Sequence, residues 1–248
     1  MSIPEVPKPT SAHELEFYSN HFRKYELLIE YKNLREPEHC PTGVYVMPSI
    51  DNIYEWYGVI FIHRGYYKEG VFKFFIEIPE QYPYAPPRVE FITSLFHPLV
   101  SKDGRFSLDQ QFATWRPRID NICHILHYIK NSFKDAVLQN LQEEYCLNKE
   151  AYRTYVRDRH AFVKLAAQVA QASSSEKSVY ERIEGSTLNF SYMTDDEAET
   201  LRLKLITNQG AVSLPSASPA GGQSVFDKIT TNINYFFTGH PENGHGGL

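Results

Sequence analysis

Cysteines and histidines are the side chains of this sequence that are best suited to nucleophilic or metal chemistry. The sequence holds three cysteines, Cys40, Cys123 and Cys146, and Cys123 lies one helical turn before His127, with His124 beside it. Zinc ligands use such a spacing, but a structural zinc site needs four ligands, and no second pair accompanies this one. We therefore expect no metal and no cofactor, and we expect Cys123 to be a small apolar residue of a helix.

The composition is typical of a folded protein in a reducing compartment. Hydrophobic residues make up 42% and charged residues 22% of the 248 residues, which favours a packed core over disorder. The net charge of −5 gives no electrostatic footprint for nucleic acid, and three cysteines are too few for a disulfide scaffold. The chain shows no secretory signal and no run of about 18 apolar residues, so we expect a cytoplasmic location and no membrane span.

The order of the expected elements is typical of an α+β domain, in which helices pack on an antiparallel sheet. A first helix is predicted over 11–36, and the residues that share one of its faces are Leu15, Tyr18, Phe22, Tyr25 and Ile29. Four short runs with strand character follow, at 44–47, 55–63, 71–78 and 88–93. An irregular segment follows over 94–117. It leads to two later helices, one at about 119–133 and one at 148–171.

We divide the chain into an extended lead-in over 1–10, one folded domain over 11–172 and a mostly disordered tail over 173–248. Within the tail, Thr194 and Glu197 fit a capping box that opens a short helix. A second short helix has an apolar face that is our candidate partner-binding surface, formed by Phe226, Ile229, Ile233 and Phe237. The alternative is that both helices dock back on the body or stay frayed.

The most specific motif is the segment 82–91, Tyr-Pro-Tyr-Ala-Pro-Pro-Arg-Val-Glu-Phe, which precedes and enters the fourth expected strand. Each proline fixes its own φ and favours extended geometry in the residue before it. This segment resembles the signature turn of the ubiquitin-conjugating enzyme family, and the resemblance covers about residues 11–171. It implies an N-terminal helix, a four-stranded antiparallel sheet and two later helices. The fold-signature residues are Tyr82, Pro83, Pro86, Pro87, His97, Pro98 and Trp115.

The resemblance also gives the catalytic position by counting. In the family, the nucleophilic cysteine lies eight residues after the asparagine of a His-Pro-Asn motif, and a tryptophan lies eight residues further on. Here His97 and Pro98 are followed by Leu99, eight residues later stands Ser107, and eight residues after that stands Trp115. The register therefore places Ser107 at the nucleophile position and Leu99 at the asparagine position.

Both substitutions oppose conjugating activity. A ubiquitin carrier stores its modifier as a thioester, whereas a serine hydroxyl needs an adjacent general base to act as a nucleophile. The side chain of Leu99 cannot donate a hydrogen bond to an oxyanion, and losing one such donor typically costs about 10²–10³ in rate. We expect a pseudo-enzyme without catalytic residues. A Ser107–His97 pair is the enzymatic alternative, while the resemblance implies a structural role for His97.

Five further segments resemble the fused-toes or AKT-interacting protein family, whose members have the conjugating fold without the catalytic cysteine. The segments are 43–49, 56–62, 70–74, 96–100 and 112–116. The resemblance implies an adaptor in a complex with a Hook-type coiled-coil adaptor and a Hook-interacting protein, which links vesicle or endosome cargo to microtubule motors. It also implies a cytoplasmic protein that is peripheral on endosomes or associated with microtubules.

Two other functions remain open. The chain is suited to act as a ubiquitin-pathway cofactor, a conjugating-enzyme variant that binds ubiquitin or an active conjugating enzyme. Such variants typically lack the later helices, however, and residues 119–171 supply both of them here. The remaining alternative is an unusual enzyme that uses Ser107.

Overall fold

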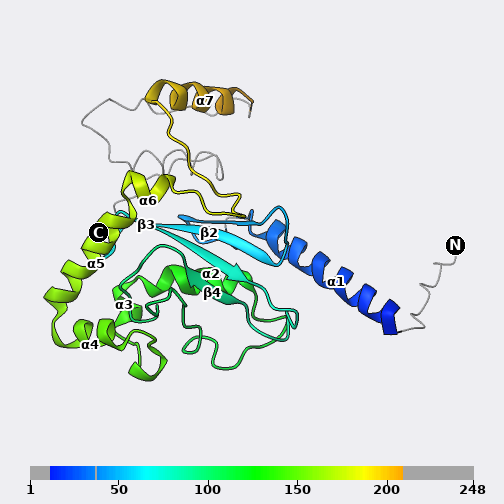
Figure 1. Ribbon diagram of the computed structural model, residues 1–248, viewed down its shortest axis with the longest axis horizontal. Coiled ribbons are helices and arrows are strands. Elements are labelled where there is room, and N and C mark those ends of the chain that lie inside the picture. The colour runs from blue at the N-terminus through cyan, green and yellow to red at the C-terminus, as the bar shows by residue number, and fades with distance from the viewer. Residues whose placement is uncertain (1–11, 37, 209–248) are drawn as a thin grey trace.

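The computed structural model describes residues 12–36 and 38–208, and a four-stranded antiparallel sheet lies at its centre (Figure 1). The strands pair in chain order and are β1 (Val44–Pro48), β2 (Glu55–Ile62), β3 (Gly70–Glu77) and β4 (Arg88–Phe91). The helices are α1 (Ala12–Asn33), α2 (Ile122–Ser132), α3 (Asp135–Leu138), the 3₁₀ helix η1 (Glu143–Tyr145), α4 (Lys149–Arg157), α5 (Arg159–Ser173), α6 (Glu176–Tyr180) and α7 (Asp195–Asn208). The predicted α+β fold is confirmed.

The inner face of the sheet carries the main hydrophobic core, because alternate residues of a strand point to the same face. Phe72 and Phe74 of β3 are fully buried there, and the Phe72 ring stacks on Phe133, with centroids 5.6 Å apart. Gly58 of β2 leaves room for this packing, since a Cβ atom there would come within 2.2 Å of the Phe74 ring. Helix α2 packs into the same core, so the core fixes the helix that follows the irregular segment.

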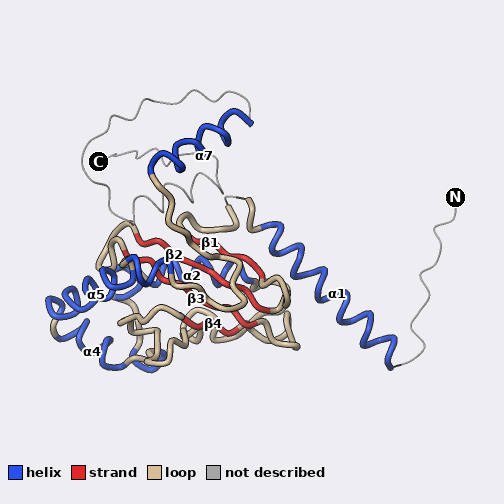
Figure 2. The backbone as a smooth tube through the Cα atoms, turned by 45° about the horizontal axis from the view of Figure 1, so that its top comes forward, coloured by secondary structure: helices blue, strands red, loops and turns tan. Residues whose placement is uncertain are grey.

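Helix α1 contacts the body near its C-terminal end, and the rest of it extends away from the body (Figures 1 and 2). The Tyr31 ring meets Trp56 edge to face, with centroids 5.7 Å apart, and Leu27 is fully buried. The apolar periodicity thus predicted the helix correctly, but three of the side chains that revealed it, Phe22, Tyr25 and Ile29, point to solvent. Their exposed fractions are 69% for Phe22, 64% for Tyr25 and 57% for Ile29.

The single helix predicted over 148–171 is two helices, because Asp158 ends α4 and begins α5. Its backbone leaves the helical region (φ −137°, ψ 80°), and its carboxylate accepts a hydrogen bond from the Ala161 N–H at 2.9 Å. Aspartate is a preferred N-cap residue, since this bond satisfies a donor at the start of the helix. The break lets α5 pack beside β3, where the Val71 N–H donates to Ser173 Oγ at 3.0 Å.

Residues 174–190, which we name the C-terminal strap, cover the outer face of the sheet. Val179 of α6 is buried there, and Lys73 of β3 donates from Nζ to the carbonyl oxygens of Ser178 (2.9 Å) and Glu181 (2.7 Å). The sheet residues of this second cluster are Tyr45, Val59, Phe61 and Val71. The expectation of disorder from residue 173 onward therefore does not describe the strap, whose few apolar side chains lie in a serine-rich sequence without periodicity.

Helix α7 begins at the capping box that the sequence predicts. The Glu197 N–H donates to Thr194 Oγ1 at 3.3 Å, and the Thr194 N–H donates to the Glu197 carboxylate at 2.9 Å. The second tail helix, with Phe226, Ile229, Ile233 and Phe237, lies outside the described residues, and the boundaries at 11 and 172 stay predictions. Within the described part of the chain, every helix is too short or too polar to span a bilayer.

Candidate functional site around Ser107

The structure brings Ser107 and Leu99, the two positions that the sequence count singled out, side by side. The Ser107 N–H donates to the Leu99 carbonyl at 2.8 Å, and the chain between them folds back so that Val100 pairs with Phe106. Ser107 is 3% exposed and Leu99 is fully buried. The irregular segment thus forms a closed turn, in which neither side chain is presented to solvent.

Gly104 allows this turn to lie against the edge of the sheet. Its φ of +93° lies in a region that favours glycine, and a Cβ atom there would come within 2.2 Å of the Phe91 carbonyl oxygen. The close approach serves two backbone hydrogen bonds to β4, from the Phe91 N–H to Gly104 O (2.7 Å) and from the Phe106 N–H to Val89 O (2.8 Å). Strand β4 therefore sets the position of Ser107.

His97 orients the start of the same segment. The Leu99 N–H donates to His97 Nδ1 at 3.1 Å, which leaves the ring proton on Nε2, and this nitrogen donates to Ser132 O at 3.1 Å. Burial lowers the pKa of the imidazole to about 4, since the charged form is disfavoured away from water. Because backbone groups engage both ring nitrogens, His97 has no nitrogen to offer Ser107 as a general base.

The Ser107 hydroxyl itself has a backbone partner. Its Oγ accepts a hydrogen bond from the Asp109 N–H at 3.4 Å. Among the described residues, no carboxylate or imidazole is hydrogen-bonded to this oxygen. A serine without a neighbouring base is a weak nucleophile, so the arrangement suits a structural hydroxyl.

Burial disfavours the thiolate form of all three cysteines. Burial raises the pKa of the Cys40 thiol to about 12 and that of the Cys146 thiol to about 11, and it also raises the pKa of Cys123. Cys40 Sγ donates to Val44 O at 3.2 Å. Thiols with raised pKa values stay protonated and unreactive at neutral pH. Among the described residues, no three His, Cys, Asp or Glu side chains form a group that could hold a metal ion.

The signature turn is tied to both α1 and α2. Trp115 Nε1 donates to Pro83 O at 2.7 Å, and the peptide bond between Tyr82 and Pro83 is cis. The Tyr82 hydroxyl donates to Glu30 of α1, whose second carboxylate oxygen accepts from the Ile122 N–H at 3.1 Å. Burial raises the pKa of Glu30. Sequence reasoning found the turn but missed Glu30, because a single glutamate within a helix carries no motif.

A hollow of about 430 Å³ lies beside the C-terminal end of the irregular segment, between residues 110–112 and α2. The Phe112 and Tyr128 rings meet edge to face there, with centroids 5.9 Å apart. Arg116 pairs with Asp120 at 2.6 Å, and the hydrogen bond from Arg116 lowers the pKa of the carboxyl. Sequence reasoning also missed this hollow, since its walls come from segments that no shared pattern connects.

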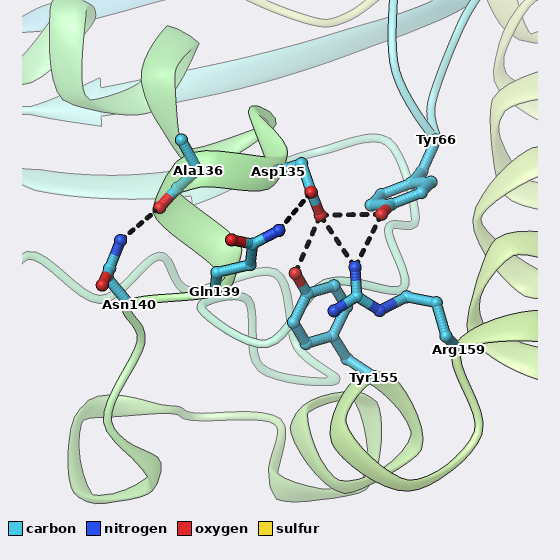
Figure 3. Close-up of polar contacts among 7 residues, drawn as sticks. All are labelled: Tyr66, Asp135, Ala136, Gln139, Asn140, Tyr155 and Arg159. Atoms are coloured by element: carbon cyan, nitrogen blue, oxygen red, sulfur yellow. Dashed lines mark hydrogen bonds and ion pairs between the residues drawn. The ribbon is translucent and has the colours of Figure 1, made fainter.

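Asp135, at the start of α3, joins three further elements (Figure 3). Its Oδ1 accepts hydrogen bonds from the Tyr66 hydroxyl (2.7 Å), the Tyr155 hydroxyl (2.8 Å) and the Arg159 guanidinium (3.0 Å). These partners, Tyr66 first, lower the pKa of Asp135. The hub fastens the β2–β3 loop, α4 and α5 together, and we assign it a structural role.

Comparison with known proteins agrees with this fold. The profile of the ubiquitin-conjugating enzyme family matches residues 26–170. The chain is 29% identical over 215 residues to the Protein AKTIP homolog of Nematostella vectensis, an alignment that covers 86% of this chain and 70% of that protein. It is 32% identical over 167 residues to the crossbronx homolog of Anopheles gambiae, covering 64% and 69% respectively. Human AKT-interacting protein is 37% identical over 147 residues, covering 58% and 48%.

Proposed function

The chain belongs to the ubiquitin-conjugating enzyme family, in the fused-toes branch that contains AKT-interacting protein and crossbronx, and from this premise we propose that it is a non-catalytic adaptor. The observation that carries the proposal is the environment of Ser107. This serine stands at the expected cysteine position, is 3% exposed and uses its hydroxyl to accept a backbone hydrogen bond. Leu99, at the expected asparagine position, is fully buried beside it.

The surroundings of Ser107 oppose a carrier function. Acyl transfer to Ser107 would need a base to take the hydroxyl proton. The imidazole of the same segment is His97, and both of its ring nitrogens are hydrogen-bonded to backbone groups. An oxyanion formed there would find no donor in the Leu99 side chain, and one missing donor typically costs about 10²–10³ in rate. Together these features support a protein that uses the conjugating fold for binding and not for catalysis.

We further propose that the adaptor binds a Hook-type coiled-coil protein and a Hook-interacting protein, and so links vesicle or endosome cargo to microtubule motors. The proposal rests on membership in the fused-toes branch and on the family role stated for it. The name AKT-interacting protein indicates a protein partner for that relative, which agrees with a binding function. The corresponding location is cytoplasmic, peripheral on endosomes or associated with microtubules.

The proposal that the protein is non-catalytic predicts that activating enzyme does not charge it with ubiquitin. The full chain is incubated with activating enzyme, ATP and ubiquitin, next to an active conjugating enzyme. We expect an adduct below about 1% of that of the active enzyme, because both the nucleophile and the oxyanion donor are lost. Ser107→Ala should behave like the unaltered chain. A thiol-resistant ubiquitin ester that forms on the unaltered chain and not on Ser107→Ala would overturn the proposal.

The adaptor part is tested by affinity capture with the full chain and with a chain that ends at residue 208, read by mass spectrometry. Recovery of a Hook-type coiled-coil protein by the full chain supports the proposal. Loss of this partner from the shorter chain would assign the contact to the region of Phe226, Ile229, Ile233 and Phe237. Recovery of ubiquitin or an active conjugating enzyme, with no coiled-coil protein, would favour the cofactor function instead.

A further inference from the structure

A second hollow, of about 470 Å³, lies where the end of β2 meets the end of α2, and we name it the basic hollow. Its lining comes from three parts of the chain, namely Thr42, residues 62–65, and Lys130 with residues 133–135. The apolar part of this lining is Ile62 and Phe133, whose side chains are both buried. Sites for small organic molecules typically measure about 300–1,000 Å³ and combine apolar walls with a few polar groups. The basic hollow therefore has the size and the walls of a small-molecule site.

The charged groups of the basic hollow have one predominant sign. Arg64, Lys130 and Lys134 supply three cations. Asp135 is the only carboxylate of the described lining, so two positive charges remain with histidine counted as neutral, although the whole chain carries −5. The Asp135 carboxylate is also bound by Arg159 and by two tyrosine hydroxyls, which reduces the repulsion that it offers to an anion (Figure 3). The basic hollow is therefore suited to an anionic ligand.

Two of the three cations have no other role in the described structure. Lys130 lies in the last turn of α2, where a cation balances the partial negative charge of the helix end, and its Nζ donates to Phe61 O at 3.1 Å. Gly43 makes room for this ammonium group, since a Cβ atom there would come within 3.2 Å of Nζ. Arg64 and Lys134 are exposed, and within residues 12–36 and 38–208 neither side chain takes part in a hydrogen bond or an ion pair. These two side chains are available to a ligand.

The charge of the basic hollow matches a phosphate monoester. Such a group carries about −1.5 to −2 at pH 7, whereas a carboxylate carries a single negative charge. A guanidinium group binds phosphate through paired N–H donors, and a lysine adds a point charge. We propose that the basic hollow binds a small organic phosphate monoester, with the phosphate on Arg64 and Lys134 and the organic part against Ile62 and Phe133. The monoester is either a soluble compound or the headgroup of a lipid.

Phenyl phosphate is a suitable probe, because it joins a phosphate monoester to an apolar ring. Isothermal titration calorimetry of the full chain should give a Kd on the order of 100 µM, as expected for so small a ligand. Phenyl sulfate has the same ring but one negative charge, so it should bind about tenfold more weakly. Absence of saturable binding at about 5 mM phenyl phosphate, or equal Kd values for the two probes, would overturn the proposal.

Substitutions locate the binding site. Arg64→Gln and Lys134→Gln should each raise the Kd for phenyl phosphate about tenfold, because each removes a charge-assisted hydrogen bond. Both side chains are exposed, so the midpoint of thermal unfolding should stay the same. Lys68→Gln is the matched control, since it removes one positive charge from the loop of Arg64, but Lys68 pairs with Glu69 and lies outside the lining.

The control should leave the Kd for phenyl phosphate unchanged within about twofold. If Lys68→Gln raises this Kd as much as Arg64→Gln does, the binding reflects the general surface charge and the proposed site is wrong. If Arg64→Gln and Lys134→Gln both bind as tightly as the unaltered chain, the ligand lies elsewhere and the proposal is overturned as well.

Vesicles distinguish the two sources of the monoester. Phosphatidic acid presents a phosphate monoester and phosphatidylglycerol a diester, each at about 20% in phosphatidylcholine. Selective cosedimentation of the full chain with phosphatidic acid, lost in Arg64→Gln and Lys134→Gln, would support a lipid source. Binding of phenyl phosphate without this selectivity would support a soluble compound. The proposal is independent of the adaptor function, so its failure would leave the charging and capture experiments unaffected.

Discussion

His97 is a single residue whose burial makes the whole fold sensitive to acid. Its folded-state pKa is lowered from 6.5 to about 4 by burial. Above pH 6.5 the residue is neutral in both states and adds no pH dependence. Below that value His97 is protonated in the unfolded chain but stays neutral in the folded chain. Stability is therefore lost as the pH falls from 6.5 to about 4. The loss amounts to about 3 kcal/mol, at 1.4 kcal/mol per pH unit.

We predict that His97→Asn makes the free energy of unfolding less dependent on acid, because an amide keeps a donor and an acceptor but does not titrate. Urea unfolding at about pH 7 and about pH 4.5 should show the wild-type chain losing about 2–3 kcal/mol more than the variant. His160→Asn replaces an exposed histidine and is the control, with the full wild-type loss. Equal losses for the wild-type and His97→Asn chains would contradict the role given to this imidazole.

Gly104 is the second residue on which the Ser107 segment depends. Gly104→Ala should destabilise the protein by about 2 kcal/mol or more, because the new Cβ both strains a positive φ and collides with β4. Gly65→Ala is matched in backbone, with φ +87° against +93°, but its Cβ meets its nearest neighbour at 3.7 Å. It should cost only the backbone strain, about 1 kcal/mol. Similar midpoints of thermal unfolding for the two variants would show that the contact with Phe91 does not matter.

At the scale of elements, the C-terminal strap makes the outer sheet face part of the interior. Tyr57 of β2 donates to Glu184 O at 3.1 Å, and the Phe190 ring meets Phe61 edge to face at 6.2 Å. Gly185, with φ +76°, lets the strap pass this tyrosine, since a Cβ there would lie 2.9 Å from its hydroxyl oxygen. A chain cut at residue 172 would therefore lose these contacts with the sheet.

A chain that ends at residue 172 should be less stable than one that ends at residue 192 by on the order of 4 kcal/mol. The shorter chain loses the buried Val179 and the partly buried Phe190, each worth about 1.5–3 kcal/mol of apolar burial. Urea unfolding measures the difference, and binding of a hydrophobic dye reports the uncovered face. If both chains unfold at the same urea concentration and bind equal amounts of dye, the strap does not contribute to the domain.

Local patterns predicted the elements better than their packing. Steps of three and four along α1 predicted a helix, but such a periodicity alone does not show whether the apolar face packs on the body or is exposed. The pattern over 148–171 continues through Asp158, and only the cap geometry reveals the break. The strap shows no hydrophobic periodicity, because Val179 and Phe190 are isolated apolar residues in a polar sequence.

At the scale of the whole molecule, two features of the sequence predicted the fold and the position of the site. They are the proline-rich turn and the residue spacing after His97. The prolines of residues 82–91 identified the family fold, and counting from His97 placed Leu99 and Ser107 in positions that the structure joins by a hydrogen bond. Glu30 and Asp135 could not be predicted, because each connects elements that are far apart along the chain. Such long-range contacts follow from packing, which a local pattern does not encode.

The closure of the strap over Lys73 has a consequence for chemical labelling. Lys73 is 6% exposed as a residue, its amine already donates to two strap carbonyls, and burial lowers the pKa of that amine. An amine-reactive reagent can reach it only when the strap lifts from the sheet. Lys68, which is exposed on the neighbouring loop, provides the reference rate. The ratio of the two acylation rates thus reads out, from within the native sequence, how often the protein opens its outer face.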